Sequence, residues 1–201
     1  DDNTAQAAPQ YAYGVASGDP LADRVILWTH ARLPGSDADV PLVWEVAQDA
    51  AFTQLVASGK TVAAASAGHT AKADATGLAA GQSYFFRFRH DVQDSGAARL
   101  SPVGRTRTLP AAGAANLALA VLGCSNYPAG YFHVMAEVAR SDAQYVLHLG
   151  DFIYEYAAGG YASADAPGMG RVVQPATECL SLADYRTRYA QYRGDPDSKV
   201  L

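Results

Sequence analysis

The sequence predicts a two-part chain, in which a β-sandwich is followed by the beginning of an α/β domain. Over roughly the first hundred residues, short segments rich in β-forming residues recur between turn signals, as in a sandwich. After residue 116, alternation gives way to continuous apolar runs separated by a helical period. The stretch PAAGAA at 110–115 has the composition of a linker. We therefore expect domains at 1–112 and 113–201.

Composition limits the classes of partner. The 201 residues are 49% hydrophobic, so the chain can bury a core, and 20 acidic against 15 basic residues give a net charge of -5. This charge disfavours non-specific binding to a nucleic acid backbone, so we expect no nucleic acid as a scaffolded partner of the protein. A small anionic substrate held by a metal is compatible with it. No apolar run reaches the length of a bilayer span, so no membrane span is expected.

The expected strands of the first part are short and are separated by turn signals. Tyr84, Phe86 and Phe88 alternate with Phe85, Arg87 and Arg89, which predicts one buried face and one polar face. The expected strands lie within residues 23–33, 41–49, 55–67 (two weaker segments around Ser58-Gly59), 69–92 and 98–110.

The motifs of the first part indicate structural roles more than catalytic or ligand-binding ones. The SGKT stretch at 58–61 lacks the partner glycine of a phosphate loop. The SGDP stretch at 17–20 is typical of a turn in which glycine supplies a positive φ. His30, His69 and His90 lie in or beside expected strands with no second ligand at useful spacing, so we expect surface or interior histidines.

The second part opens with a strand–helix–strand unit. Residues 117–123 are apolar on both faces, as in a central parallel strand, and 143–151 form a second such run. Between them, 130–142 has a helical period that places Phe132, Met135, Ala136 and Ala139 on one side. We expect two parallel strands joined by a right-handed crossover.

Polar residues follow both of these strands. Cys124 comes after the first, Asp151 after the second, and Tyr154 three residues later. Because parallel strands end at one edge of a sheet, we expect the three side chains to converge there. Thiolate, carboxylate and phenolate together suit a highly charged cation, and phenolate favours ferric iron.

Simpler interpretations of the same residues stay open. Asp151 can cap a turn, Tyr154 can be a core aromatic, and Cys124 can form a disulfide with Cys179. His148 is expected to point into the core. His133 is expected to open the helix, near the crevice at the sheet edge where the three side chains converge. The segment 157–170 is expected to be a mobile loop, with a flexible rim over the site as its functional interpretation.

The stretch from Gly123 to Tyr156, which contains HLGDFIYEY, resembles the start of the catalytic domain of the alkaline phosphatase D family. This family lies within the calcineurin-like metallophosphoesterases. The first part is similar to the family's N-terminal immunoglobulin-like module, and TGLAAGQSYFFRF at 76–88 resembles the tyrosine corner of fibronectin type III-like domains. Residues 177–201 resemble the helical segment that follows in the family.

The resemblance implies a phosphomonoesterase or phosphodiesterase that hydrolyses phosphate esters with a metal-activated hydroxide. It implies iron (Fe³⁺) and calcium, with Asp151 as the metal-bridging carboxylate, Tyr154 as the iron phenolate and Cys124 as a further iron ligand. It indicates no catalytic residue beyond these ligands. The later Asn-His segment, further histidines and remaining acidic ligands of the family are not found up to Leu201, so the expected partners are a phosphate ester and a missing C-terminal part of the same protein.

The resemblance also implies export to the periplasm or cell surface, and DDNTAQAAPQYAYG is typical of the end left by signal-peptide removal. An alternative function of another class is a non-catalytic recognition or adhesion protein. In that case the β-sandwich would bind the partner and the α/β segment would be a structural remnant.

Overall fold

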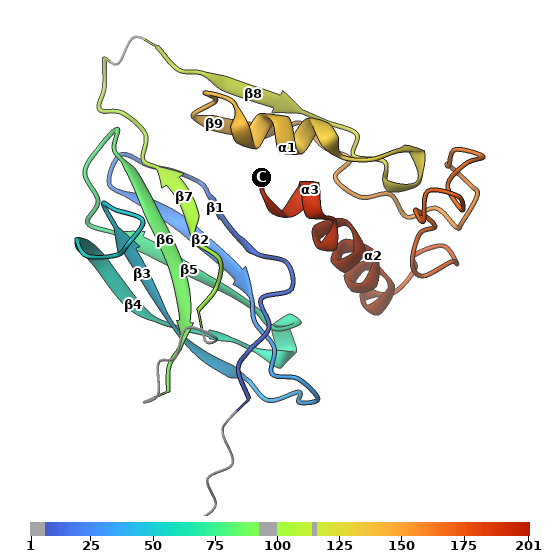
Figure 1. Ribbon diagram of the computed structural model, residues 1–201, viewed down its shortest axis with the longest axis horizontal. Helices are drawn as coiled ribbons and strands as arrows, with labels where there is room; N and C mark the ends of the chain where they lie inside the picture. The colour runs from blue at the N-terminus through green and yellow to red at the C-terminus, as the bar shows by residue number, and fades with distance from the viewer. Residues whose placement is uncertain (1–6, 93–99, 114–115) are drawn as a thin grey trace, which may run out of the picture. The chain divides into compact units, whose positions relative to one another are not determined.

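The computed structural model describes residues 7–92, 100–113 and 116–201, and the chain divides into two compact units, 1–115 and 116–201. Figure 1 shows a mostly β first unit and a second unit that carries the α-helices of the described residues. Residues 1–6 of the end expected to be left by signal-peptide removal, 98–99 of the expected strand at 98–110, and 114–115 of the expected linker lie outside the described residues.

The first unit consists of two antiparallel sheets. One has three strands in the order β1-β2-β5, and the other has four in the order β4-β3-β6-β7. The strands are β1 (Val15–Gly18), β2 (Arg24–His30), β3 (Val40–Ala47), β4 (Leu55–Ala63), β5 (Thr70–Thr76), β6 (Ser83–His90) and β7 (Gly104–Arg107). A short 3₁₀ turn, η1 (Ala65–Ala67), precedes β5.

Both sheets contribute to one core. The predicted alternation in β6 is confirmed, because Tyr84, Phe86 and Phe88 are buried while their neighbours are only partly so. The same buried cluster contains β2 and β5 residues from the facing sheet, including Leu27 and Ala73. The Tyr84 hydroxyl accepts a 2.9 Å hydrogen bond from the Ala79 backbone N–H, which fixes the chain where it enters β6.

Three details differ from the prediction. The short strand β1 was not expected. Residues 55–63 form one continuous strand, because Gly59 leaves room for packing and makes no turn: a Cβ there would lie 2.6 Å from the Trp44 ring. In the SGDP turn, the positive φ belongs to Asp19 (45°) and not to the glycine.

The second unit begins with the expected strand–helix–strand unit. Strand β8 (Leu119–Leu122) pairs with β9 (Tyr145–His148) in parallel, with Leu119 opposite Tyr145. Helix α1 (His133–Arg140) connects them and buries Met135 and Ala136, which confirms its expected apolar side. A 3₁₀ turn η3 (Tyr127–Ala129), helix α2 (Leu182–Gly194) and the one-turn helix α3 (Pro196–Lys199) complete the unit.

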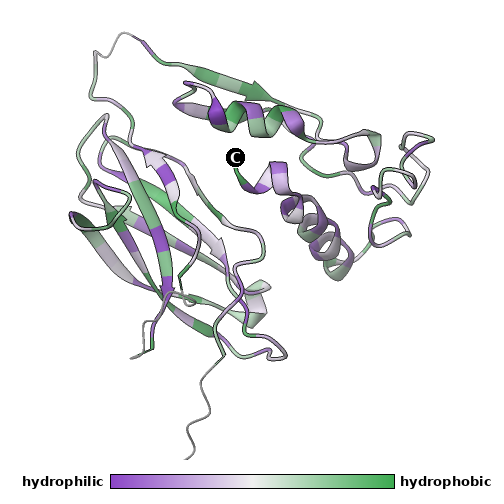
Figure 2. Cartoon of the chain, viewed as in Figure 1, coloured by the Kyte–Doolittle hydropathy of each residue, from purple (hydrophilic) through white to green (hydrophobic). Residues whose placement is uncertain are grey.

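The expectation that these strands are buried on both faces is wrong for this chain. Four of their apolar side chains are 44–56% exposed, because the sheet has only two strands over the described residues: Leu119, Val121, Val146 and Leu147. Figure 2 shows the hydrophobic colouring along β8. Over the part of the chain that the structure describes, no helix combines the length and apolar character required to cross a membrane.

Candidate metal centre

The loops after β8 and β9 are joined to each other. Beyond the strands themselves, the Leu149 N–H donates to the Leu122 carbonyl at 2.8 Å and the Cys124 N–H donates to the Gly150 carbonyl at 3.1 Å. The Ser125 N–H then donates to the Asp151 carbonyl at 2.8 Å. These bonds extend the parallel pairing into the loops and place Cys124 and Asp151 side by side at one edge of the sheet.

Both residues adopt an uncommon backbone conformation. Cys124 has a φ of 56° and Asp151 a φ of 55°, in the left-handed region that non-glycine residues rarely occupy. Aspartate tolerates this region better than cysteine, because its short polar side chain can bond locally. Left-handed residues at the ends of two paired strands turn the chain sharply, and such strain clusters at functional sites.

The Asp151 carboxylate is the centre of the side-chain cluster. Its Oδ2 atom lies 3.6 Å from the Cys124 Sγ and 3.5 Å from the Tyr154 hydroxyl. The structure therefore brings the three predicted side chains together, and their role as metal ligands stays a prediction. Cys124 and Asp151 are exposed and Tyr154 is half-buried, so the cluster is open to solvent.

Cys124 and Asp151 both affect the protonation of the Tyr154 phenol. The pKa of Tyr154 is raised, first by its hydrogen bond with Cys124, then by partial burial and by the negative charge of Asp151. A multivalent cation would neutralise this mutual repulsion, so the donor set fits a metal of high charge. Among His, Cys, Asp and Glu side chains of the described residues, no group of three could hold a metal, and the cluster reaches three donors only through Tyr154.

The cysteines are free thiols. Cys124 is exposed and Cys179 is buried, and neither forms the disulfide that the simpler interpretation allowed. The Cys179 N–H donates to the Glu155 carbonyl at 2.9 Å, and burial raises the pKa of its thiol. Cys179 therefore supports the loop that follows the cluster and leaves the Cys124 sulfur available.

His148 contacts the loops on which Cys124 and Asp151 lie. Its Nδ1 accepts a 3.3 Å bond from the Gly150 N–H, so Nε2 carries the proton that faces the Ser125 hydroxyl at 3.0 Å. The Phe152 ring packs edge-on against the imidazole at 5.5 Å. With both nitrogens in these contacts, the half-buried His148 holds the glycine that precedes Asp151.

Arg188 was missed by the sequence analysis. Arg188 lies on α2 and is only 1% exposed. Its guanidinium donates to five carbonyl oxygens, those of Tyr154, Tyr156 (3.1 Å), Gln174 (3.0 Å), Pro175 (2.9 Å) and Thr177 (3.4 Å). It thereby joins the backbone that carries Tyr154 to a second loop. The signal available in the sequence was weak, since an arginine in a polar helix is usually a solvent-exposed residue.

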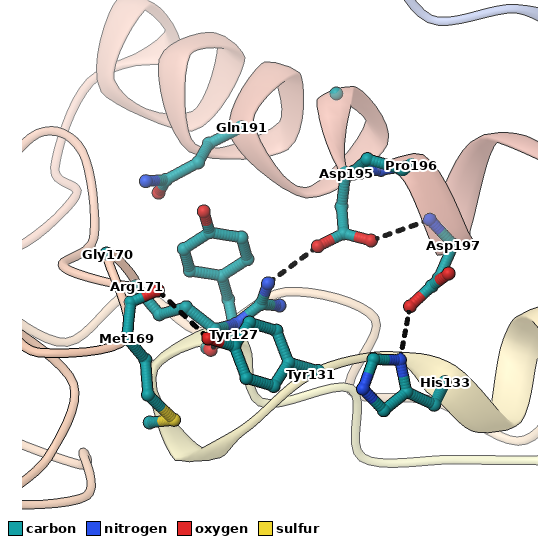
Figure 3. Close-up of a pocket in the computed structure, with 11 residues that line it drawn as sticks. Tyr127, Tyr131, His133, Met169, Gly170, Arg171, Gln191, Asp195, Pro196 and Asp197 are labelled. Atoms are coloured by element: carbon teal, nitrogen blue, oxygen red, sulfur yellow. Dashed lines mark hydrogen bonds and ion pairs between the residues drawn. The ribbon is translucent and has the colours of Figure 1, made fainter.

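The expectation for His133 was a position near the crevice, and the structure places it in another cluster. The His133 Nδ1 lies 2.8 Å from the Asp197 carboxylate, at the rim of a cavity of about 540 Å³ (Figure 3). Inside it, Arg171 pairs with Asp195 at 2.6 Å and stacks on the Tyr127 ring at 3.7 Å. This buried pair joins η3 to the start of α3 and is not part of the Cys124–Asp151–Tyr154 cluster.

The segment 157–170 is a series of turns with several anchors. The Ser163 N–H donates to the Pro128 carbonyl at 3.0 Å, and the Asn126 side-chain amide donates to the Tyr161 carbonyl at 3.1 Å. The Ala158 N–H donates to the Ala176 carbonyl at 2.8 Å. This segment passes beside the cluster and brings one further aromatic residue, Tyr161, to Tyr154.

The fold and the site together define the class of protein. A β unit is followed by an α/β unit, in which acidic side chains lie at the carboxyl ends of two parallel strands. The family model described as "PhoD-like phosphatase, N-terminal domain" matches residues 1–110, and the one described as "PhoD-like phosphatase" matches 119–201. The chain belongs to the PhoD-like phosphatase family, as its resemblance predicted.

Two individual comparisons agree with this membership. "Alkaline phosphatase D" of Bacillus subtilis (strain 168) is 39% identical over 208 residues, which cover 96% of this chain and 34% of the relative. The solved structure titled "Structure of PhoD" superposes with a TM-score of 0.85 at 37% identity, over 100% of this chain and 38% of that one. The chain thus spans about a third of the length of the relatives it matches.

Proposed function

We propose that this chain supplies a β module and the first part of the catalytic domain of a metal-dependent phosphate ester hydrolase, acting on phosphomonoesters or phosphodiesters. The observation that carries the proposal is the cluster of Cys124, Asp151 and Tyr154 at the carboxyl edge of β8 and β9, in a chain of the PhoD-like family. The Bacillus subtilis relative, alkaline phosphatase D, supports the ester chemistry by its name.

The first unit is, in this proposal, an immunoglobulin- or fibronectin III-like sandwich. Its two facing antiparallel sheets and the bond between the Ala79 N–H and the Tyr84 hydroxyl support this assignment. The second unit is the opening of a calcineurin-like metallophosphoesterase sheet, which its parallel β8–β9 pair supports. Export to the periplasm or cell surface stays a prediction from the family resemblance.

The phenolate of Tyr154 favours ferric iron, and the family resemblance implies calcium as the accompanying metal. In this assignment Tyr154 and Cys124 would hold iron, and Asp151 would be the carboxylate shared between the metals. Bound metals would supply positive charge to the phosphoryl oxygens and a strong nucleophile at neutral pH. Other residues of the chain hold these side chains in position. His148 bonds to Gly150, next to Asp151, and Arg188 bonds to the Tyr154 carbonyl.

Three protein donors do not complete a two-metal site. Phosphoryl transfer depends on positioning and on stabilisation of charge, so a partial ligand set should lose most of the rate. We therefore propose that the 201 residues alone hydrolyse phosphate esters negligibly, and that the remaining ligands come from a C-terminal part of the same protein.

The test compares the 201-residue chain with a chain extended to the length of its relatives, both supplied with iron and calcium. We expect hydrolysis of p-nitrophenyl phosphate and its bis-ester only by the longer chain. Asp151→Asn should abolish turnover without a backbone penalty, because asparagine also tolerates a positive φ. Full activity of Asp151→Asn would overturn the site assignment.

The metal assignment has its own readout. Tyr154→Phe in the longer chain should weaken iron binding and remove any visible phenolate-to-iron absorption. Tyr185→Phe, an exposed tyrosine of α2, is the matched control and should leave the absorption intact. If the metal-supplied longer chain hydrolyses no ester at all, the non-catalytic recognition function becomes the better interpretation.

A further inference from the structure

Two exposed tyrosines extend the candidate metal centre. The Tyr161 ring packs edge-on against Tyr154 with centroids 5.3 Å apart, and the Tyr156 ring stacks on Tyr154 at 6.2 Å. Tyr156 and Tyr161 also contact each other edge-to-face at 5.7 Å. The ring whose hydroxyl reaches Asp151 is therefore one member of a three-tyrosine cluster.

The backbone of the two outer tyrosines is held in place, while their rings are accessible. Arg188 donates to the Tyr156 carbonyl, and Asn126 donates to the Tyr161 carbonyl. Tyr156 is nevertheless 45% exposed and Tyr161 53% exposed. Core aromatics bury most of their area, so these rings are positioned by their backbone and offer their surface to solvent.

We propose that Tyr156 and Tyr161 form a binding subsite for the planar aromatic group of a phosphate ester, such as an aryl or nucleobase-containing substituent. The inference rests on the proposed function and names the substrate class of that same site. The Tyr154 hydroxyl lies 3.5 Å from the Asp151 Oδ2, so we place the substituent of an ester bound at Asp151 over the Tyr154 ring. The next surfaces it meets there are the Tyr156 and Tyr161 rings.

Ring geometry favours a planar partner. Aromatic pairs prefer offset-stacked or edge-to-face contacts with centroids 4.5–7 Å apart, and each exposed ring can accept one more such neighbour. The three rings contact one another directly, so their exposed faces are the surfaces left for a ligand. An alkyl ester would gain less, because it lacks the quadrupole that aligns two rings.

The deciding experiment measures binding of two non-hydrolysable phosphonates to the extended, iron- and calcium-supplied protein by calorimetry. We expect phenylphosphonate to bind at least fivefold more tightly than methylphosphonate. Tyr156→Ala combined with Tyr161→Ala should remove that preference, while Tyr185→Ala on α2 should retain it. Equal affinity for both phosphonates in the wild type, or a preference that survives the double substitution, overturns the subsite.

A kinetic arm separates this inference from the proposed function. Phosphate release from p-nitrophenyl phosphate and from glycerol phosphate gives the ratio of kcat/KM for an aryl and an alkyl ester. The double variant should lower this ratio at least fivefold, mainly through KM for the aryl ester, and should retain the phenolate-to-iron absorption of Tyr154. If the wild type hydrolyses neither ester, the proposed function fails, and the calorimetry still decides the subsite.

Discussion

Two histidines lie next to each other in the interior of the first unit. His30, at the end of β2, is 9% exposed, and His69, with a φ of 59°, is 7% exposed, with ring centroids 6.3 Å apart. The Tyr13 ring covers His30 at 4.4 Å, and neither histidine Nδ1 has a hydrogen-bond partner among the described residues. Burial, followed by the positive charges of His69 and Arg32, lowers the pKa of His30 to about 4.

This histidine should make the first unit acid-sensitive. Above the ordinary pKa of 6.5, His30 is neutral in both states and contributes no pH dependence. Between pH 6.5 and about 4 only the unfolded chain binds the proton, so stability falls with falling pH, by at most about 3 kcal/mol in total. Urea denaturation followed by tryptophan fluorescence measures this, because Trp28 and Trp44, the two tryptophans of the chain, both lie in this unit. His30→Gln should reduce the slope between pH 6.5 and 4, and an unchanged slope would contradict the assignment.

At the scale of single elements, helix α2 joins two loops through hydrogen bonds from one of its side chains. Its buried Arg188 donates to carbonyl oxygens of Tyr154 and Tyr156 in one loop and of Gln174, Pro175 and Thr177 in the other. Lysine cannot replace it, because a single ammonium lacks the planar fork that reaches both loops at once.

Arg188→Lys should therefore destabilise the second unit by about 2–4 kcal/mol and weaken the placement of Tyr154. Far-UV ellipticity is the appropriate probe, since the α-helices of the described residues all belong to this unit. Arg186→Lys, at an exposed position of the same helix, is the control and should change little. The idea is wrong if both substitutions have equal effects.

Strand β7 depends on a glycine for close packing. Gly104 pairs with Phe86 across the sheet, and a Cβ at this position would overlap the Phe86 ring and lie 2.8 Å from a Val15 methyl group. Gly104→Ala should cost about 1–3 kcal/mol through overpacking, as measured by tryptophan fluorescence in urea. Gly18→Ala, where nothing lies within 4 Å, should have a much smaller effect. Equal costs at both positions would show that the glycine is not required for packing.

The elements with strong local signals were predictable, and those fixed by distant contacts were not. Alternation predicted the buried face of β6, and the order of strand and polar residue predicted where Cys124 and Asp151 meet. The four residues of β1 are too few for a period to be visible. Gly59 resembles a turn signal until the Trp44 ring opposite it is known, and the role of Arg188 depends on the path of loops far along the chain.

At the scale of the whole chain, the two units differ in how much core they bury. The cluster of the first unit contains fifteen buried residues, whereas the described second unit has a cluster of three, Phe132, Met135 and Tyr192. Its two-stranded sheet also exposes apolar side chains, with Leu149 at 71%. Since burial of apolar surface is the main source of stability, the second unit should be the weaker one.

We therefore expect the 201-residue chain to unfold in two transitions. Far-UV ellipticity, which follows the helices of the second unit, should fall at a lower urea concentration than tryptophan fluorescence, which follows the first unit. In a chain extended to the length of the PhoD-like relatives, additional layers over β8 and β9 should move the helical transition upward and leave the tryptophan transition in place. Coincident transitions in the 201-residue chain would show instead that the two units fold as one cooperative body.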